Sequence, residues 1–481
     1  MISVFLREQK CYTRKDLMEL FECSENQLDF IVRKLKEFGI LKFVRQSRVQ
    51  FNMSELVDET VEFGSLELNS KEYDYVFTFV GIIVVAGRIL KCYPKYLFNV
   101  ENPVIELRKI YKVIEKYNSK EQSINMLNDY TGNNSFNLLP VLLFLMQDYF
   151  ENGIYNNSKA IIEANGSGEI LWDKTINETF SILSNNRPYY VEIQTKKRIN
   201  NEYDYFKRLH ECILTKVSKE LRDADLLALF EITAIELTDE SLYEFGDKEY
   251  ILYRLENELN IQFNTRKQLV LKTLYSYIKH GGQLASVDGI SFFGTNSFNL
   301  VWECVCKEIL NNQLDMTLGQ LKTYVKLNQE DNLNTKLIDL IDKPFWSLTN
   351  KNANDTLVPD LITIFENRFY IFDAKYYTPK LKYGQTPKGQ PGIESVTKQY
   401  LYQLAYKSFI DAHKFQAVKN CFLLPTDKKV VENLGCVSIA MMTNLGLQDI
   451  EVRSVPATLA YDFYLSNKKK CNIWNISINI C

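Results

Sequence analysis

Two aspartates and a lysine lie where two apolar segments of this sequence meet. Asp360 stands near the start of residues 358–365, and Asp373 and Lys375 stand near the end of residues 369–377. The short polar stretch between the segments predicts a turn, so together they should form a β-hairpin. Side chains alternate along a strand, which places Asp373 and Lys375 on one face, and Asp360 can reach the same end. Charged groups are rarely placed in so apolar a sheet without a ligand.

Hydrolysis of a phosphodiester is the chemistry that uses two carboxylates and an ammonium group. Mg²⁺ prefers hard oxygen ligands, so Asp360, Asp373 and the main-chain carbonyl of Ala374 are candidate ligands. The metal would polarise the phosphate, while Lys375 could position or deprotonate the attacking water and offset charge in the transition state. These residues match the PD…(D/E)xK nuclease signature, with twelve residues between the aspartates. So short a pattern recurs by chance, and its placement on two expected strands is what supports it.

Two flanking segments supply further candidates. Residues 297–310 predict a helix in which Glu303 stands beside an apolar face, as a third acid near the metal would; an exposed helix glutamate is the alternative. Residues 397–406 predict another helix, with Gln399 and Gln403 four positions apart on one face and able to reach the site or a phosphate. A polar stripe on a surface helix is the alternative there.

Composition narrows the classes of protein that this chain can represent. It has 481 residues and a formal net charge of -3, so any nucleic-acid contact must rest on local positive charge. Residues 375–429 contain ten lysines against three acids, as a phosphate-binding surface requires. Scattered cysteines and only three histidines predict free thiols, a cytoplasmic location and no structural zinc. No apolar run approaches the roughly 20 residues of a membrane span, so we expect no membrane contact.

The first 54 residues predict a winged helix-turn-helix domain. A short helical pattern is followed by Ser24 as an N-cap, a second amphipathic helix, Gly39 as a stop and an alternating hairpin over residues 40–51. Between residues 33 and 48, six basic residues face one acid, which predicts DNA contact by the second helix and the wing. Docking of another protein is the alternative, because many such domains never touch DNA.

The length predicts two to four domains in an α/β multidomain chain. We expect a winged helix-turn-helix over residues 1–54 and a mixed α+β middle region over 55–289, which serves as a scaffold or contacts DNA or a partner. Residues 290–481 should form the α/β core of a restriction-endonuclease-like nuclease. Within the middle region, two glycines in the alternating stretch 163–173 predict a tight hairpin.

Several stretches taken together resemble the LlaJI family of restriction endonucleases. They are residues 75–81, 94–96, 165–173, 204–210, 298–303, 358–360 and 372–376, and the resemblance runs from about residue 70 to the end. It implies a Mg²⁺-dependent type II enzyme of the PD-(D/E)xK superfamily that cuts a short double-stranded DNA sequence beside protective methyltransferases. By this resemblance Asp360 and Asp373 are metal ligands and Lys375 is the catalytic lysine. The resemblance also implies that Glu303 and Gln399 belong to the site.

The chain also resembles McrC-like nuclease subunits, which work with an McrB-like AAA+ GTPase that supplies target recognition. We find no nucleotide-binding motif in the sequence, so the chain would be the nuclease half of such a system. Three interpretations stay open: a restriction endonuclease, a nuclease subunit that needs the GTPase, and a non-catalytic DNA-binding regulator. Cleavage of both strands needs two active sites, so we expect a homodimer on DNA.

Overall fold

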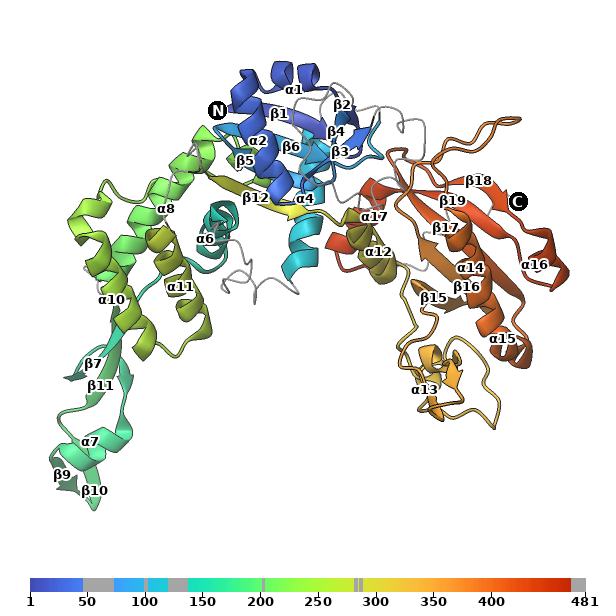
Figure 1. Cartoon of the computed structure of the whole chain (residues 1–481). Coiled ribbons are helices and arrows are strands. Elements are labelled where there is room, and N and C mark those ends of the chain that lie inside the picture. The colour runs from blue at the N-terminus through green and yellow to red at the C-terminus, as the bar shows by residue number, and fades with distance from the viewer. Residues whose placement is uncertain are drawn as a thin grey trace. The chain divides into compact units, whose positions relative to one another are not determined.

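The computed structural model describes residues 1–45, 73–98, 103–119, 137–200, 204–280, 284 and 289–468. The chain forms two compact units, residues 1–124 with 287–481 and residues 125–286, so the second is an insertion in the first (Figure 1). Six separate sheets accompany the helices in these described ranges, which confirms the mixed α/β multidomain class. The winged helix-turn-helix, the nuclease core and the boundaries at residues 54 and 289 stay predictions. Within the described ranges, no helix is both long and apolar enough to cross a membrane.

The N-terminal segment contains two short helices. α1 (Arg14–Leu20) begins at Thr13, whose hydroxyl accepts from the N–H of Asp16 at 3.2 Å. α2 (Glu25–Glu37) begins after Ser24, as predicted, because the residues that follow carry an apolar stripe. β2 (Cys11–Tyr12), β3 (Leu41–Arg45) and β4 (Tyr73–Phe77) form a sheet of order β2-β4-β3. The strand after Gly39 therefore pairs with β4; the rest of the predicted hairpin lies outside the described residues.

A four-stranded sheet joins the N-terminal segment to distant parts of the chain. Its order is β1 (Ile2–Arg7), β6 (Arg88–Tyr93), β5 (Val80–Val85) and β12 (Ile290–Thr295). Gly81 of β5 lies opposite Gly294 of β12, and a Cβ on Gly81 would lie 2.2 Å from the Phe293 carbonyl oxygen. Only glycine allows so close an approach. Side chains of α1, α2 and both sheets then share one apolar core.

The C-terminal part of the first unit is built on a five-stranded sheet. Its order is β15 (Leu361–Phe365), β16 (Arg368–Ala374), β17 (Ala417–Thr426), β19 (Ile450–Pro456) and β18 (Glu432–Val437). β15 and β16 form the predicted hairpin, because Glu366 and Asn367 both adopt positive φ angles (48° and 57°) in its two-residue turn. β16, β17 and β19 are parallel neighbours.

Helices pack around this sheet. α14 (Ile393–Ala405) contacts β16, β17 and β19, and α12 (Phe298–Ile309) contacts β16 and α17 (Ala457–Leu465) (Figure 1). The other helices and strands that the structure describes in this unit are α4 (Val104–Ser119), α13 (Leu318–Leu321), η3 (Leu337–Leu340), β13 (Phe345–Trp346), β14 (Lys351–Asn352), α15 (Lys407–His413) and α16 (Ala440–Asn444). α12 follows β12 directly, so one continuous segment links the N-terminal sheet to the C-terminal one.

The second unit combines a helical part with small strands. Its elements are α6 (Leu138–Asn152), β7 (Ser158–Ala164), β8 (Glu169–Ile170), α7 (Trp172–Glu178), β9 (Ser181–Ser184), β10 (Arg187–Tyr190), β11 (Gln194–Asn200), α8 (Tyr205–Asp223), α9 (Leu227–Phe230), η2 (Leu242–Phe245), α10 (Lys248–Ile261) and α11 (Thr265–His280). The hairpin predicted over residues 163–173 is wrong, because β7 and β8 both pair with β11 and lie on its two sides. Gly168 instead permits close approach to β11, since a Cβ there would lie 2.3 Å from the carbonyl oxygen of Lys196.

Candidate active site

The end of the β15–β16 hairpin brings the two predicted aspartates together. The register pairs Leu361 with Phe372, so one further step along both strands places Asp360 opposite Asp373. The N–H of Ala374 donates to Oδ2 of Asp360 at 2.9 Å and holds that carboxyl in place. Asp373 is only 3% exposed, and Nζ of Lys375 lies 3.1 Å from its Oδ2. Two carboxyl groups and one ammonium group thus share the end of the hairpin.

The electrostatic balance of this cluster is unfavourable without a further cation. Burial, a hydrogen bond with Asp373 and the charge of Asp373 raise the pKa of Asp360 well above its usual range. Lys375 and the Ala374 N–H oppose this shift without cancelling it. Burial acts to lower the pKa of Lys375, but the two aspartates outweigh it and leave that pKa raised. The protein alone therefore favours a proton on Asp360 and a charged Lys375.

The donor set fits a hard divalent cation. A metal ion between two adjacent carboxylates takes the place of the proton that burial and repulsion otherwise retain. Asp360 and Asp373 are the side chains that could hold it. Asp360 lines a cleft together with Lys375 and with Ala374, whose carbonyl is the third predicted ligand. In the described part of the chain, no three Asp, Glu, His or Cys side chains gather closely enough to form a metal site by themselves. Main-chain and water oxygens would have to complete the coordination.

Glu303 lies in the same cleft but is not gathered with the two aspartates. Its carboxylate pairs with Lys307, one turn further along α12. The helix itself is fixed to the sheet by Trp302, whose Nε1 donates to the carbonyl of Leu423 at 3.1 Å. The same carbonyl accepts the N–H of Lys375 at 3.0 Å, so one β17 oxygen positions both α12 and the strand that carries the lysine.

Gln399 and Gln403 are buried where α14 packs on the sheet, and neither lines the cleft. Nε2 of Gln399 donates to the carbonyl of Ile371 at 3.1 Å and also to the side chain of Asn420. Oε1 of Gln403 accepts the N–H of Gln448 at 3.0 Å. Both glutamines are buried, so the alternative of a polar surface stripe is wrong. Their hydrogen bonds connect α14 to β16, to β17 and to the segment that precedes β19.

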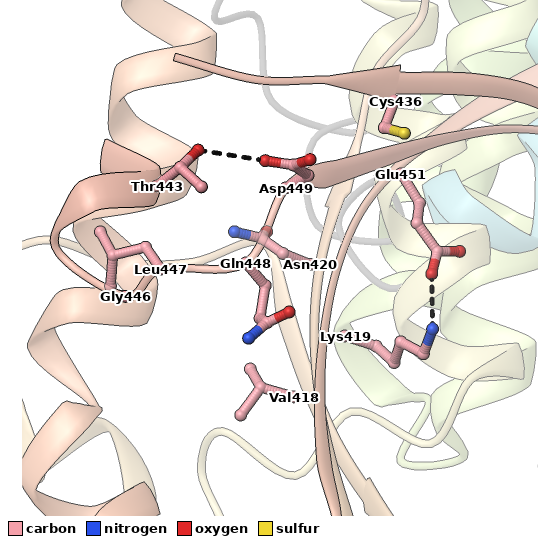
Figure 2. Close-up of a pocket in the computed structure, with 10 residues that line it drawn as sticks. All are labelled: Val418, Lys419, Asn420, Cys436, Thr443, Gly446, Leu447, Gln448, Asp449 and Glu451. Carbon is pink, nitrogen blue, oxygen red and sulfur yellow. Dashed lines mark hydrogen bonds and ion pairs between the residues drawn. The ribbon is translucent and has the colours of Figure 1, made fainter. Parts of the chain in front are cut away.

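A second polar pocket lies at the opposite end of β17 and β19 (Figure 2). There Nζ of Lys419 lies 2.8 Å from the carboxylate of Glu451, and the hydroxyl of Thr443 lies 3.3 Å from Asp449. Glu451 also receives Arg453 at 2.6 Å. Glu451 is paired with two basic side chains, which distinguishes it from the adjacent carboxyl groups of Asp360 and Asp373. Glu451 lies outside residues 375–429, so its ion pair with Lys419 neutralises one of the ten lysines counted in that stretch.

The carboxylate cleft has a second wall that sequence reasoning missed. It has a volume of about 480 Å³, and its lining includes residues of the N-terminal segment such as Glu8, Gln9 and Lys95. Glu8 is buried, accepts the Tyr376 hydroxyl and receives the N–H of Lys95 at 3.2 Å. Burial raises the pKa of Glu8. Lys95 stands in the 94–96 stretch that carries the family resemblance, yet no pattern in the sequence indicates that it reaches the hairpin.

Tyr402 on α14 is another residue that the sequence did not single out. Its pKa is raised to about 12. Burial is the largest cause, and the negative charges of Asp373, Asp360 and Glu303 add to it. The phenol therefore lies within electrostatic range of all three acids. Tyr402 stands three positions after Gln399 on the same helix. In the sequence an aromatic residue there is typical of an apolar core position, so nothing pointed to the acids.

Two solved structures give weak similarity to the chain. One is an assembly of Thermococcus gammatolerans McrB AAA+ hexamers with bound McrC, with 12% identity, a TM-score of 0.39, and coverage of 97% of this chain and 99% of that chain. The other is the McrBC complex of the same organism, with 15% identity, a TM-score of 0.27, and coverage of 65% and 88%. These scores do not bear on the fold.

Sequence similarity is more informative. The chain is 25% identical over 418 residues to the type II restriction enzyme BsuMI component YdjA of Bacillus subtilis (strain 168), covering 82% of each protein. A sequence model of LlaJI restriction endonucleases matches residues 79–461, which include the hairpin, the flanking helices and most of the four-stranded sheet. With a match over most of its length, this chain belongs to the LlaJI restriction endonuclease family and is a nuclease of a restriction system.

Proposed function

We propose that the chain hydrolyses phosphodiester bonds of double-stranded DNA at a short specific site, in a Mg²⁺-dependent reaction, within a system whose methyltransferases protect the host DNA. The observation that carries the proposal is the pair of adjacent carboxyl groups, of buried Asp373 and half-buried Asp360, with Lys375 beside them. The hairpin, β17 and the helices around them would be the PD-(D/E)xK core. The N-terminal helices and the β2-β4-β3 sheet would be a winged helix-turn-helix.

Each residue of the cluster has a distinct part in this reaction. Asp360 and Asp373, with the carbonyl of Ala374, would hold Mg²⁺, which supplies a water of lowered pKa and polarises the phosphate. The raised pKa of Lys375 keeps its ammonium group charged at neutral pH. Lys375 therefore acts by donating hydrogen bonds to the phosphate and the attacking water, and by offsetting negative charge in the transition state. This favours an electrostatic role over deprotonation of the water.

Glu303 and Gln399 take supporting parts in the proposal. Glu303 lines the cleft and would bind a metal-coordinated water once released from Lys307. Gln399 would act as a positioning residue, because it is bonded to the carbonyl of Ile371, two residues before Asp373. Neither residue needs to touch the reacting phosphate.

The test is cleavage of unmethylated plasmid DNA with Mg²⁺ by the purified chain. We expect discrete fragments from the unaltered protein and none from Asp360→Asn, Asp373→Asn or Lys375→Met. Asp449→Asn, in the pocket of Figure 2, is the matched control and should cut normally. Full cleavage by the three cluster variants would refute the assignment, and DNA binding without any metal-dependent cutting would favour a regulator.

A second candidate is a nuclease subunit that cuts only when an AAA+ GTPase partner is engaged. The observation that favours it is a group of exposed apolar side chains around the β9–β10 hairpin of the second unit. Phe180 is 97% exposed and Leu183 is 74% exposed, and Ile182, Tyr189 and Val191 are exposed beside them. Exposed apolar groups in such numbers mark a protein contact. The similarity to a protein named as a component of a restriction enzyme agrees with a multi-part system.

Addition of an McrB-like AAA+ GTPase and GTP to the plasmid assay separates the two candidates. If cleavage requires both, Leu183→Asp should abolish the stimulation, and a charge at Ile105, an exposed apolar residue of the first unit, should not. Equal cleavage with and without the partner would exclude the second candidate and favour a nuclease that cuts by itself.

A further inference from the structure

One loop of the first unit carries positive charge without any acidic residue. Residues 376–392, here called the lysine loop, lead from Lys375 at the end of the hairpin to the start of α14. The loop contains Lys380, Lys382 and Lys388, and it contains no aspartate or glutamate. Residues 380–388 are all exposed. The loop therefore presents its charges to solvent and not to the core of the protein.

The lysine loop has a defined base. The N–H of Lys380 donates to the carbonyl of Lys388 at 2.8 Å, which makes an antiparallel bridge between the two limbs. Below the bridge the limbs approach closely, because Gly389 adopts a φ of 67° and a Cβ there would lie 3.1 Å from the Thr378 carbonyl oxygen. At the tip, the N–H of Gln385 donates to the carbonyl of Lys382 at 3.1 Å. Main-chain hydrogen bonds thus hold the three lysines on one hairpin-like loop.

Both limbs of the loop are anchored to the strand that carries Asp373. The first limb begins directly after Lys375, and the second leads into α14, where Gln399 donates to the carbonyl of Ile371 on β16 at 3.1 Å. Five residues separate Lys375 from Lys380, a span of at most about 18 Å in a fully extended chain. Each DNA strand presents one phosphate for about every 3.4 Å of the helix axis, so this span corresponds to about five base pairs. The loop is therefore within reach of phosphates that flank the scissile one.

The structure also separates these lysines from others in the basic stretch 375–429. Lys375, Lys419 and Lys428 each pair with a carboxylate. Within the part of the chain that the structure describes, the three ammonium groups of the lysine loop form no ion pair and no hydrogen bond. An ammonium group in this state keeps its charge and its three donor hydrogens for an external anion.

We propose that the lysine loop binds the DNA backbone beside the cut, with Lys380, Lys382 and Lys388 each at a phosphate. The inference rests on the proposed function and adds a substrate-binding element to it. Lysine binds phosphate as a point charge on a flexible stem and reads no base sequence. The loop therefore holds the duplex at the hairpin end without choosing the target site.

DNA binding is measured in an Asp360→Asn background, so that cleavage does not interfere. The probe is a double-stranded DNA fragment that the unaltered enzyme cuts, and its Kd is followed from about 50 to 200 mM salt. We expect replacement of all three loop lysines by glutamine to reduce the slope of log Kd against log salt by about 2.7, or about 0.9 for each lost phosphate contact. Lys248→Gln, at an exposed position of the second unit, is the matched control and should leave the slope unchanged.

Replacement of the same three lysines by arginine keeps the charge and should retain the slope. Thermal melts of both triple variants check that the fold is intact, as expected for exposed positions. An unchanged slope in the folded glutamine variant would overturn the inference. If that variant instead loses stimulation by an McrB-like GTPase, the loop is a protein contact. Either failure is distinct from failure of the proposed function, which would appear as full cleavage by the Asp360→Asn enzyme itself.

Discussion

The two ends of the C-terminal sheet place charged residues in opposite ways. At the hairpin end, burial and a neighbouring carboxyl raise the pKa of Asp360. At the other end, burial again acts to raise the pKa of Glu451, but Lys419 and Arg453 outweigh it, so that the pKa is lowered. Burial alone therefore does not mark a functional carboxylate. The absence of a sufficient internal counter-charge at the hairpin end is what points to an external cation there.

The largest expected effect is on catalysis. Asp373→Asn preserves the shape of the side chain but removes a metal ligand, and we expect DNA cleavage to fall by at least about a hundredfold. Glu451→Gln is an equivalent change at the paired end and should cut at the normal rate. Initial rates on plasmid DNA at saturating Mg²⁺ measure both. Equal losses in the two variants would remove the distinction between the ends of the sheet.

The next effect is stabilisation by the metal. Mg²⁺ at about a hundred times its Kd should stabilise the folded chain by about 2.7 kcal/mol, since it binds only the folded state. Thermal melts with and without Mg²⁺ measure this. The shift should persist in Glu451→Gln and disappear in Asp373→Asn. A shift of the same size in both variants would place the metal elsewhere.

The pH dependence of stability should also differ between the ends. The folded-state pKa of Asp360 is raised, so its contribution to stability is complete below its unfolded value, near 4, and is lost as pH rises through the folded value. Asp360→Asn has no such loss, and the variant should gain melting temperature relative to the unaltered chain between pH 5 and 9 without metal. A constant difference across this range would mean that the Asp360 pKa is not raised.

The smallest effect concerns the paired end itself. Glu451→Gln removes one charged partner of Lys419 and of Arg453, and we expect a loss of about 1 kcal/mol in the free energy of unfolding. The lowered pKa of Glu451 means that this difference should shrink as the pH falls below its usual range. Urea denaturation at pH 7 and at a series of pH values below 4 checks the size and the direction.

Local patterns were sufficient to predict the hairpin and the acids on it. Alternation over residues 358–377 depends on neighbours in the chain, and a two-residue turn closes it, so the contact between Asp360 and Asp373 follows from local geometry alone. The helix containing Gln399 was also predicted, but not its environment. Whether a polar side chain on a helix is exposed depends on which face the sheet covers, and that is a tertiary property.

The sequence by itself determined the acid, acid and lysine set, its place on a hairpin and the family resemblance, because each depends on residues close in the chain or on a recognisable pattern. Only the tertiary structure decided that Glu8 and Lys95 meet Tyr376, that Glu451 neutralises Lys419, and that Glu303 pairs with Lys307 instead of joining the aspartates. The first two depend on strand pairings between segments far apart in the chain. The Glu303–Lys307 ion pair has the i,i+4 spacing that any helix permits, but whether Glu303 takes this partner depends on what surrounds the helix.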